Sequence, residues 1–178
     1  MITWVDVLLA IVVAVLTAAG AHRKLTGLFV GVGALMALGP LLRFGQSSPW
    51  AAVAIAAVVG LVLGLLGRRF QDPGRGPAWP YQVLGGLGGA VVGVALVLAL
   101  VTSLPLQRNP ANTAEIFYPP RNLPSGVSSA LQSSPLISLG RTILFYPLLP
   151  QEQYTATEQR AYGALHSWLV VGEPWTRQ

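Results

Sequence analysis

Asp6 is the one carboxylate in the apolar stretch that opens this chain. An ionisable side chain at membrane depth is costly and is usually retained for ion or proton binding. The spacing Thr3-x-x-Asp6 also fits a capping box, in which the two side chains satisfy free amides at the start of a helix. Asp6 lies close to the expected helix end, which favours the capping role, and an ion site is the alternative.

The two histidines offer little further chemistry. His22 lies beside Arg23 and Lys24, and His166 has no second ligand residue at a useful spacing. The chain has no cysteine, no Gly-x-Ser-x-Gly motif, no Walker lysine loop and no His-Glu-x-x-His motif. We therefore predict that the protein is not an enzyme and binds neither a metal nor a cofactor.

The elements that carry these residues are strongly apolar. The chain is 53% hydrophobic and 10% charged, whereas about a quarter of the residues in a soluble domain are charged. A bilayer core of about 30 Å is crossed by about 20 apolar residues in a helix. We predict an all-α fold, a transmembrane bundle in residues 1–107 with four spans at about 3–21, 25–42, 49–67 and 83–104.

Basic residues outnumber acidic ones by eleven to six, an excess that can indicate a nucleic-acid partner. Five of the eleven instead lie in two short loops between apolar stretches: Arg23, Lys24, Arg68, Arg69 and Arg75. Positive loops stay on the cytoplasmic side of a membrane, and the loop between these two carries only Arg43. We predict a multi-pass protein of the cytoplasmic (inner) membrane, with both termini on the exported side and no nucleic-acid partner.

Small residues recur at four-residue spacing in every apolar stretch. The clearest sets are in the third and fourth stretches: Gly60, Gly64, Gly85, Gly89 and Gly93. Such stripes let helix backbones approach closely where lipid supplies no hydrophobic drive. The partner is either another span of the chain or a second copy, and a composition rich in alanine and glycine also produces such stripes by chance. The expected partners are membrane lipids and either further copies of this chain, in a homo-oligomer, or the other subunits of a membrane protein complex.

The composition of the rest of the chain predicts an extramembrane tail. Residues 108–134 are a proline-rich connector that we expect to be irregular, and residues 135–178 are an interfacial and amphipathic helical tail. Thr155 and Glu158 have capping-box spacing, which predicts a last helix that begins at Thr155 or Thr157 and ends near Val171. We expect the tail to dock on the outer ends of the spans or to contact a partner through Phe145, Tyr146, Leu165, Trp168 and Leu169.

Three short sequence features occur in the same order as in a known family of membrane proteins. Trp4-x-Asp6 opens the first span, the basic turn His22 to Lys24 precedes the second, and Gln82 to Gly89 leads into the last. This order resembles the colicin V production protein (CvpA) family, over about residues 1–149. The family has a Trp-x-Asp near its N-terminus and an Asp-Arg-x-x-Gly segment before its last span. The Asp-Arg pair is replaced by Tyr81 and Gln82 here.

The resemblance implies an integral membrane protein of the cell envelope that is linked to toxin export and envelope maintenance, with no enzymatic activity. We therefore predict a membrane scaffold or accessory subunit that assists export or envelope integrity. The alternative is an oligomeric pore or small transporter. Few polar residues lie at depth, namely Thr17, Thr102 and Ser103, which disfavours a transport path.

Overall fold

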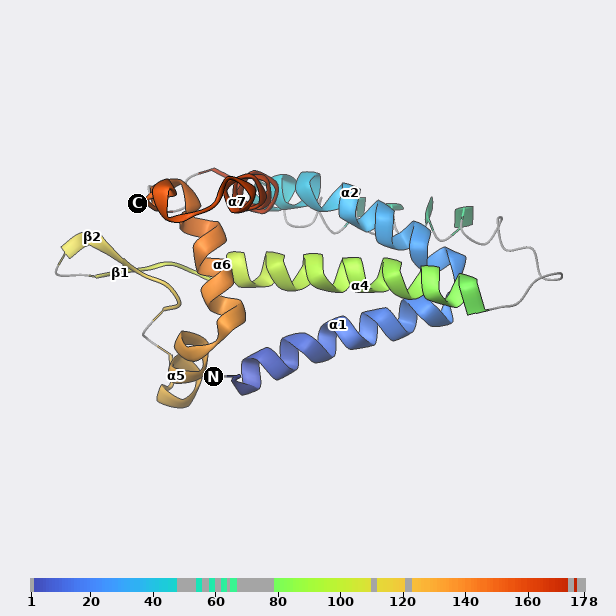
Figure 1. The fold of residues 1–178 in the computed structure, drawn as a ribbon, viewed down its shortest axis with the longest axis horizontal. Helices are drawn as coiled ribbons and strands as arrows, with labels where there is room; N and C mark the ends of the chain where they lie inside the picture. The colour runs from blue at the N-terminus through green and yellow to red at the C-terminus, as the bar shows by residue number, and fades with distance from the viewer. Residues whose placement is uncertain are drawn as a thin grey trace. The chain divides into compact units, whose positions relative to one another are not determined.

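The computed structural model describes residues 2–47, 54–55, 58–59, 62–63, 65–66, 79–109, 112–120, 123–172 and 175. These residues are predominantly helical, as Figure 1 shows. The contacts divide the chain into two compact units, one formed by residues 1–8 and 98–178 and the other by residues 9–97. Three described helices are long and apolar enough to cross a membrane: Trp4–His22, Leu25–Arg43 and Trp79–Thr102.

These three segments belong to helices α1 (Trp4–His22), α2 (Leu25–Ser47) and α4 (Trp79–Thr102). At 1.5 Å per residue, α1 is about 28 Å long and α4 about 36 Å, which matches a hydrocarbon core of about 30 Å. Helix α2 continues past its expected end at residue 42 and includes Pro40. Helix α4 begins earlier than the expected residue 83, because Pro80 fits the first turn, where its missing N–H leaves no hydrogen bond unmade.

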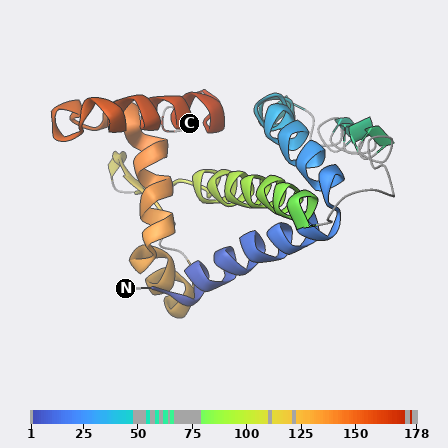
Figure 2. The same ribbon diagram turned by 45° about the vertical axis from the view of Figure 1, so that its right-hand side comes forward.

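The predicted third span, residues 49–67, lies largely outside the described residues. Its described pieces, residues 54–55, 58–59, 62–63 and 65–66, are helical. In the unit formed by residues 9–97, α4 lies between α1 and α2 (Figures 1 and 2). The surfaces of these helices carry exposed apolar side chains, among them Val15, Met36 and Leu87. An apolar outer surface of this kind is what a lipid environment requires.

The connector is more ordered than the proline content predicts. Strands β1 (Gln107–Asn109) and β2 (Asn112–Phe117) pair antiparallel, with Gln107 opposite Phe117, and α5 (Ser125–Ser133) follows. The expectation of irregular chain throughout this segment is therefore wrong, and the fold is not purely α-helical. The physical reason is where the prolines fall: Pro119 follows β2 and Pro124 precedes α5, so neither interrupts an element.

Two α-helices and two short 3-10 turns complete the tail. They are α6 (Pro135–Phe145), η1 (Tyr146–Leu148), η2 (Gln151–Gln153) and α7 (Ala156–Leu169). Helix α6 buries Ile137, Gly140, Ile143 and Leu144. Helix α7 packs on α6 and η1 (Figure 2). It begins with the capping box that the Thr155–Glu158 spacing predicts.

Candidate functional site

The contact between α1 and α4 is built from glycines. A methyl group added to Gly20 would press on the carbonyl oxygen of Gly85 and lie 2.9 Å from Cα of Gly89. Farther along α4, a methyl group on Gly93 would lie 2.9 Å from Cα of Val13. These distances are shorter than any real carbon contact, so the two backbones approach this closely only because the side chains are absent. The glycine stripe of α4 therefore faces α1 of the same chain.

Helix α2 joins this contact in the same way. A methyl group on Gly31 would lie 2.6 Å from Cα of Gly88, and one on Gly27 would lie 2.9 Å from Cα of Gly20. The three helices are thus held backbone to backbone. Gly20 and Gly88 do not belong to the four-residue stripes that the sequence suggested. The signal that could have found Gly88 is its place in a second Gly-Gly pair one turn after the first.

The turn between α1 and α2 takes part through its backbone. Lys24 has a φ of 52°, in the left-handed region, and its carbonyl group faces Gly85. The side chains of Arg23 and Lys24 are exposed. The other predicted topology and packing residues lie outside the described residues: Gly60, Gly64, Arg68, Arg69 and Arg75.

Asp6 is the centre of a buried polar junction. Its Oδ2 accepts hydrogen bonds from the amide of Thr3 at 2.8 Å and from the Thr3 hydroxyl at 2.7 Å. Its Oδ1 accepts from the hydroxyl of Ser134 at 2.5 Å and from the amide of Leu136 at 3.3 Å. Only 7% of Asp6 and 1% of Ser134 is exposed. Four donors fill the lone-pair sites of this carboxylate, which leaves none free for an ion.

Ser134 is the residue of this junction that the sequence analysis does not identify. It is the N-cap of α6, where its hydroxyl also accepts from the amide of Ile137 at 3.2 Å. Asp6 therefore lies at the N-termini of two helices, α1 and α6, where the free amides and the positive end of each helix dipole favour a negative charge. The local signal for the cap was present, because Ser134 precedes Pro135 and Pro is favoured at the first helical position.

A second contact ties α6 to the end of α4. A methyl group on Gly140 would lie 2.8 Å from Cβ of Val101 and would press on its carbonyl oxygen. Val101 and Ile143 are almost fully buried. Helix α6 thus packs on the last turn of α4 and is hydrogen-bonded to the first turn of α1, all within one unit.

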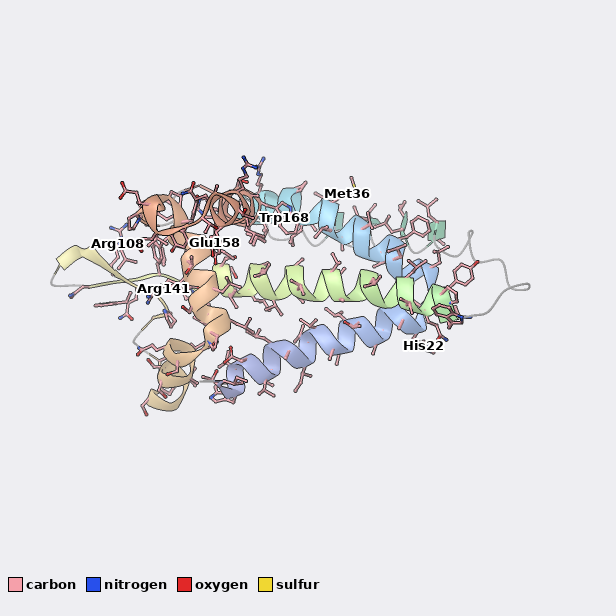
Figure 3. The ribbon with its side chains drawn as sticks, viewed as in Figure 1. His22, Met36, Arg108, Arg141, Glu158 and Trp168 are labelled. Atoms are coloured by element: carbon pink, nitrogen blue, oxygen red, sulfur yellow. The ribbon has the colours of Figure 1, made fainter. Side chains whose placement is uncertain are left out.

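The predicted docking residues of the tail separate into buried and partly open side chains. Tyr146 and Leu169 belong to the core of the tail unit, while Phe145, Leu165 and Trp168 are half-buried. Figure 3 places Trp168 on α7. A partner could therefore contact Phe145, Leu165 and Trp168 but not the buried Tyr146 and Leu169.

Aromatic rings and one histidine hold the tail helices together. Tyr146, Tyr154 and Tyr162 lie with ring centroids 5.6 to 6.3 Å apart, a range typical of favourable ring contacts. His166 on α7 lies with its Nδ1 2.9 Å from the carbonyl oxygen of Ile143 on α6. No group of three or more His, Cys, Asp or Glu residues that could hold a metal ion occurs in the described part of the chain.

Comparison of the chain with protein families, with curated proteins and with solved structures finds no match.

Proposed function

We propose that this chain is an integral membrane scaffold or accessory subunit that assists export or envelope integrity without catalysis, as the resemblance to the CvpA family implies. The observation that carries the proposal is the joint attachment of α6. One buried aspartate fixes α6 to the start of α1, and Gly140 fixes it to the end of α4. A tail held at two points presents a fixed surface to a partner, which is what a scaffold needs.

The same attachment supports a four-span topology. The start of α1 and the end of α4 belong to one compact unit, so in a membrane both lie on the same side. Helices α1, α2 and α4 supply three crossings, an odd number. A fourth crossing between residues 47 and 79 restores an even number, and the apolar stretch 49–67 lies there. We place both termini on the exported side because the basic loops lie at the opposite ends of the spans.

The alternative, an oligomeric pore or transporter, has weaker support. The hydroxyl of Thr17 donates to the carbonyl of Val13 at 2.7 Å, and that of Thr102 donates to the carbonyl of Leu98 at 2.8 Å. Both hydroxyls donate to a backbone carbonyl of their own helix, so neither is free to donate to a transported ion or solute. A cavity of about 190 Å³ beside α2 and α4 is lined by apolar residues, such as Ala34, Leu38 and Val92. A water-filled path needs polar groups instead.

Reconstitution of the purified full chain in liposomes separates the two functions. A scaffold conducts neither ions nor small solutes, and it retains a stoichiometric partner when it is extracted from its own membrane in mild detergent. Replacement of Trp168 by Glu on the partly open face of α7 should then release that partner, whereas Glu152→Gln on the exposed η2 turn should not. Solute flux through liposomes that hold only this chain would favour the transporter and refute the scaffold.

A further inference from the structure

The tail unit contains an open groove of about 850 Å³. One wall is a face of α6, and the other is formed by the end of β2, the residues that follow it and α5. The polar lining includes Gln132, Ser138, Arg141 and Thr142, of which the last three lie within two turns of α6. A volume of this size is in the range of pockets that bind small molecules.

Arg141 is the charged group of the groove. Its side chain is exposed and has no hydrogen bond or ion pair among the described residues. Among the described residues that line the groove, none is acidic. Figure 3 shows Arg141 on α6 and Glu158 on α7, where the Glu158 carboxylate accepts instead from Thr155 at 2.8 Å. The guanidinium is therefore available for an anion, and the hydroxyl of Ser138 lies about one turn before it on the same helix. The hydroxyl of Thr142 donates to the backbone carbonyl of Ser138 at 3.1 Å, so it only adds polar surface.

Tyr118 forms part of the groove wall. It lines the groove, 5% of it is exposed, and its hydroxyl is buried with no hydrogen-bond partner among the described residues. Burial raises the pKa of this phenol, so the group is a neutral hydroxyl that can donate. The hydroxyl oxygen has almost no accessible surface, so a ligand in the groove meets the ring of Tyr118 rather than its hydroxyl.

Part of the groove lining is apolar. Ile116, Phe117, Leu131 and Leu149 contribute hydrocarbon surface beside the cationic and hydroxyl groups. One positive charge next to an apolar wall fits a ligand with one anionic head and a hydrocarbon chain. The groove belongs to the same unit as the first turn of α1 and the last turn of α4. Those turns end the candidate spans, so the membrane surface is the nearest source of such a molecule.

We propose that this groove binds one anionic phospholipid of the membrane, with its phosphate against Arg141 and Ser138 and the start of its acyl chain along Ile116 and Phe117. This inference rests on the proposed membrane location. It adds to the proposed scaffold a binding site for one kind of lipid headgroup, which the transmembrane helices alone would not provide.

Native mass spectrometry of the full chain in nonionic detergent tests the site. Phosphatidylglycerol is the probe and phosphatidylcholine the control lipid. We expect one retained phosphatidylglycerol, bound about tenfold more weakly by Arg141→Gln, because a charge-assisted hydrogen bond is lost. Arg160→Gln is the matched control, since Arg160 is an exposed arginine of α7 outside the groove. Arg141 is itself exposed, so unchanged thermal unfolding of Arg141→Gln is expected and separates lost binding from lost folding.

A second variant blocks the groove without removing the charge. Ser138→Trp should also abolish retention of phosphatidylglycerol, because Ser138 is exposed in the groove beside Arg141. Equal affinity of Arg141→Gln and the wild type, or equal losses in Arg141→Gln and Arg160→Gln, would overturn the site. Complete displacement of the lipid by millimolar inorganic phosphate would show that the apolar wall is not used, and it would overturn the lipid assignment.

Discussion

At the scale of single residues, the Asp6 carboxylate decides how the tail is attached. The sequence predicted its local partner, because Thr3 and Asp6 have capping-box spacing and the structure hydrogen-bonds them. It could not predict Ser134, which lies 128 residues away. A contact between residues so distant in sequence follows from the tertiary packing of α6, and no local pattern encodes that packing.

The coupling between Asp6 and Ser134 is measurable. We expect Asp6→Ala and Ser134→Ala each to destabilise the protein, and the double variant to cost less than the sum of the two by about 0.5–3 kcal/mol. Each single change leaves the partner buried without its hydrogen bond, and the double change removes both groups. Denaturant unfolding in mixed micelles gives the three free energies.

A control cycle distinguishes real coupling from general damage. Thr155 lies in the exposed capping box of α7 and makes no hydrogen bond to Asp6. The costs of Asp6→Ala and Thr155→Ala should therefore add. Additive costs for Asp6 and Ser134 as well would show that the junction contributes nothing as a pair.

At the scale of elements, helix identity was easier to predict than helix boundaries or partners. Long apolar runs predict the positions of α1, α2 and α4, since a helix satisfies the backbone hydrogen bonds of an apolar segment within that segment. The stripe spacing identified Gly85, Gly89 and Gly93 but not the face of α1 that they meet. That face depends on Gly20, a single glycine with no stripe of its own. The proline content of residues 108–134 predicts irregular chain, but β1 and β2 pair there because the described prolines lie outside these two strands.

Gly89 tests the glycine contact. Its replacement by leucine should cost about 1–3 kcal/mol, because the new side chain would meet the backbone of Leu16 and Thr17 and force α1 and α4 apart. Val91→Leu is the matched control, since Val91 lies on an exposed part of α4 in the same turn. Thermal unfolding in detergent gives both values. A Gly89 variant as stable as the Val91 variant would mean that the backbones are not in contact.

The capping box of α7 predicts a pH dependence. Hydrogen bonds from the backbone and the side chain of Thr155 lower the pKa of Glu158 below its ordinary value of 4.5. A lowered pKa in the folded state means that the cap contributes above the ordinary pKa and is lost as the pH falls through the lowered one. The first turn of α7 should then fray on acidification, which backbone NMR shifts of Ala156 to Gln159 report.

Glu158→Gln provides the comparison for this titration. Glutamine can accept the same hydrogen bonds but does not titrate, so the first turn of α7 in the variant should not respond to acid. An identical acid response in the wild type and the variant would place the titrating group elsewhere.

At the scale of the whole molecule, charge and contact provide two separate arguments for the proposed topology. The lysine and arginine count predicts that the basic turn after α1 lies on the cytoplasmic side. The buried Asp6–Ser134 hydrogen bond requires the N-terminus and the tail to share one side, whichever side that is. Sequence reasoning had the first argument alone, because the second depends on a tertiary contact.

Cysteine labelling tests both arguments at once, and the chain has no cysteine of its own to interfere. Single cysteines can replace Ile2 near the start, His22 at the end of α1 and Ser129 on α5, all of which are exposed. A membrane-impermeant maleimide should label the first and third variants in intact cells, and the second only after permeabilisation. If His22→Cys were labelled in intact cells and the other two variants only after permeabilisation, the charge argument would be refuted. The conclusion that the N-terminus and the tail share one side would still hold. Labelling of Ile2→Cys and Ser129→Cys from opposite sides would instead contradict the Asp6–Ser134 hydrogen bond. It would also contradict the four-span topology, because an odd number of crossings would then separate the two positions.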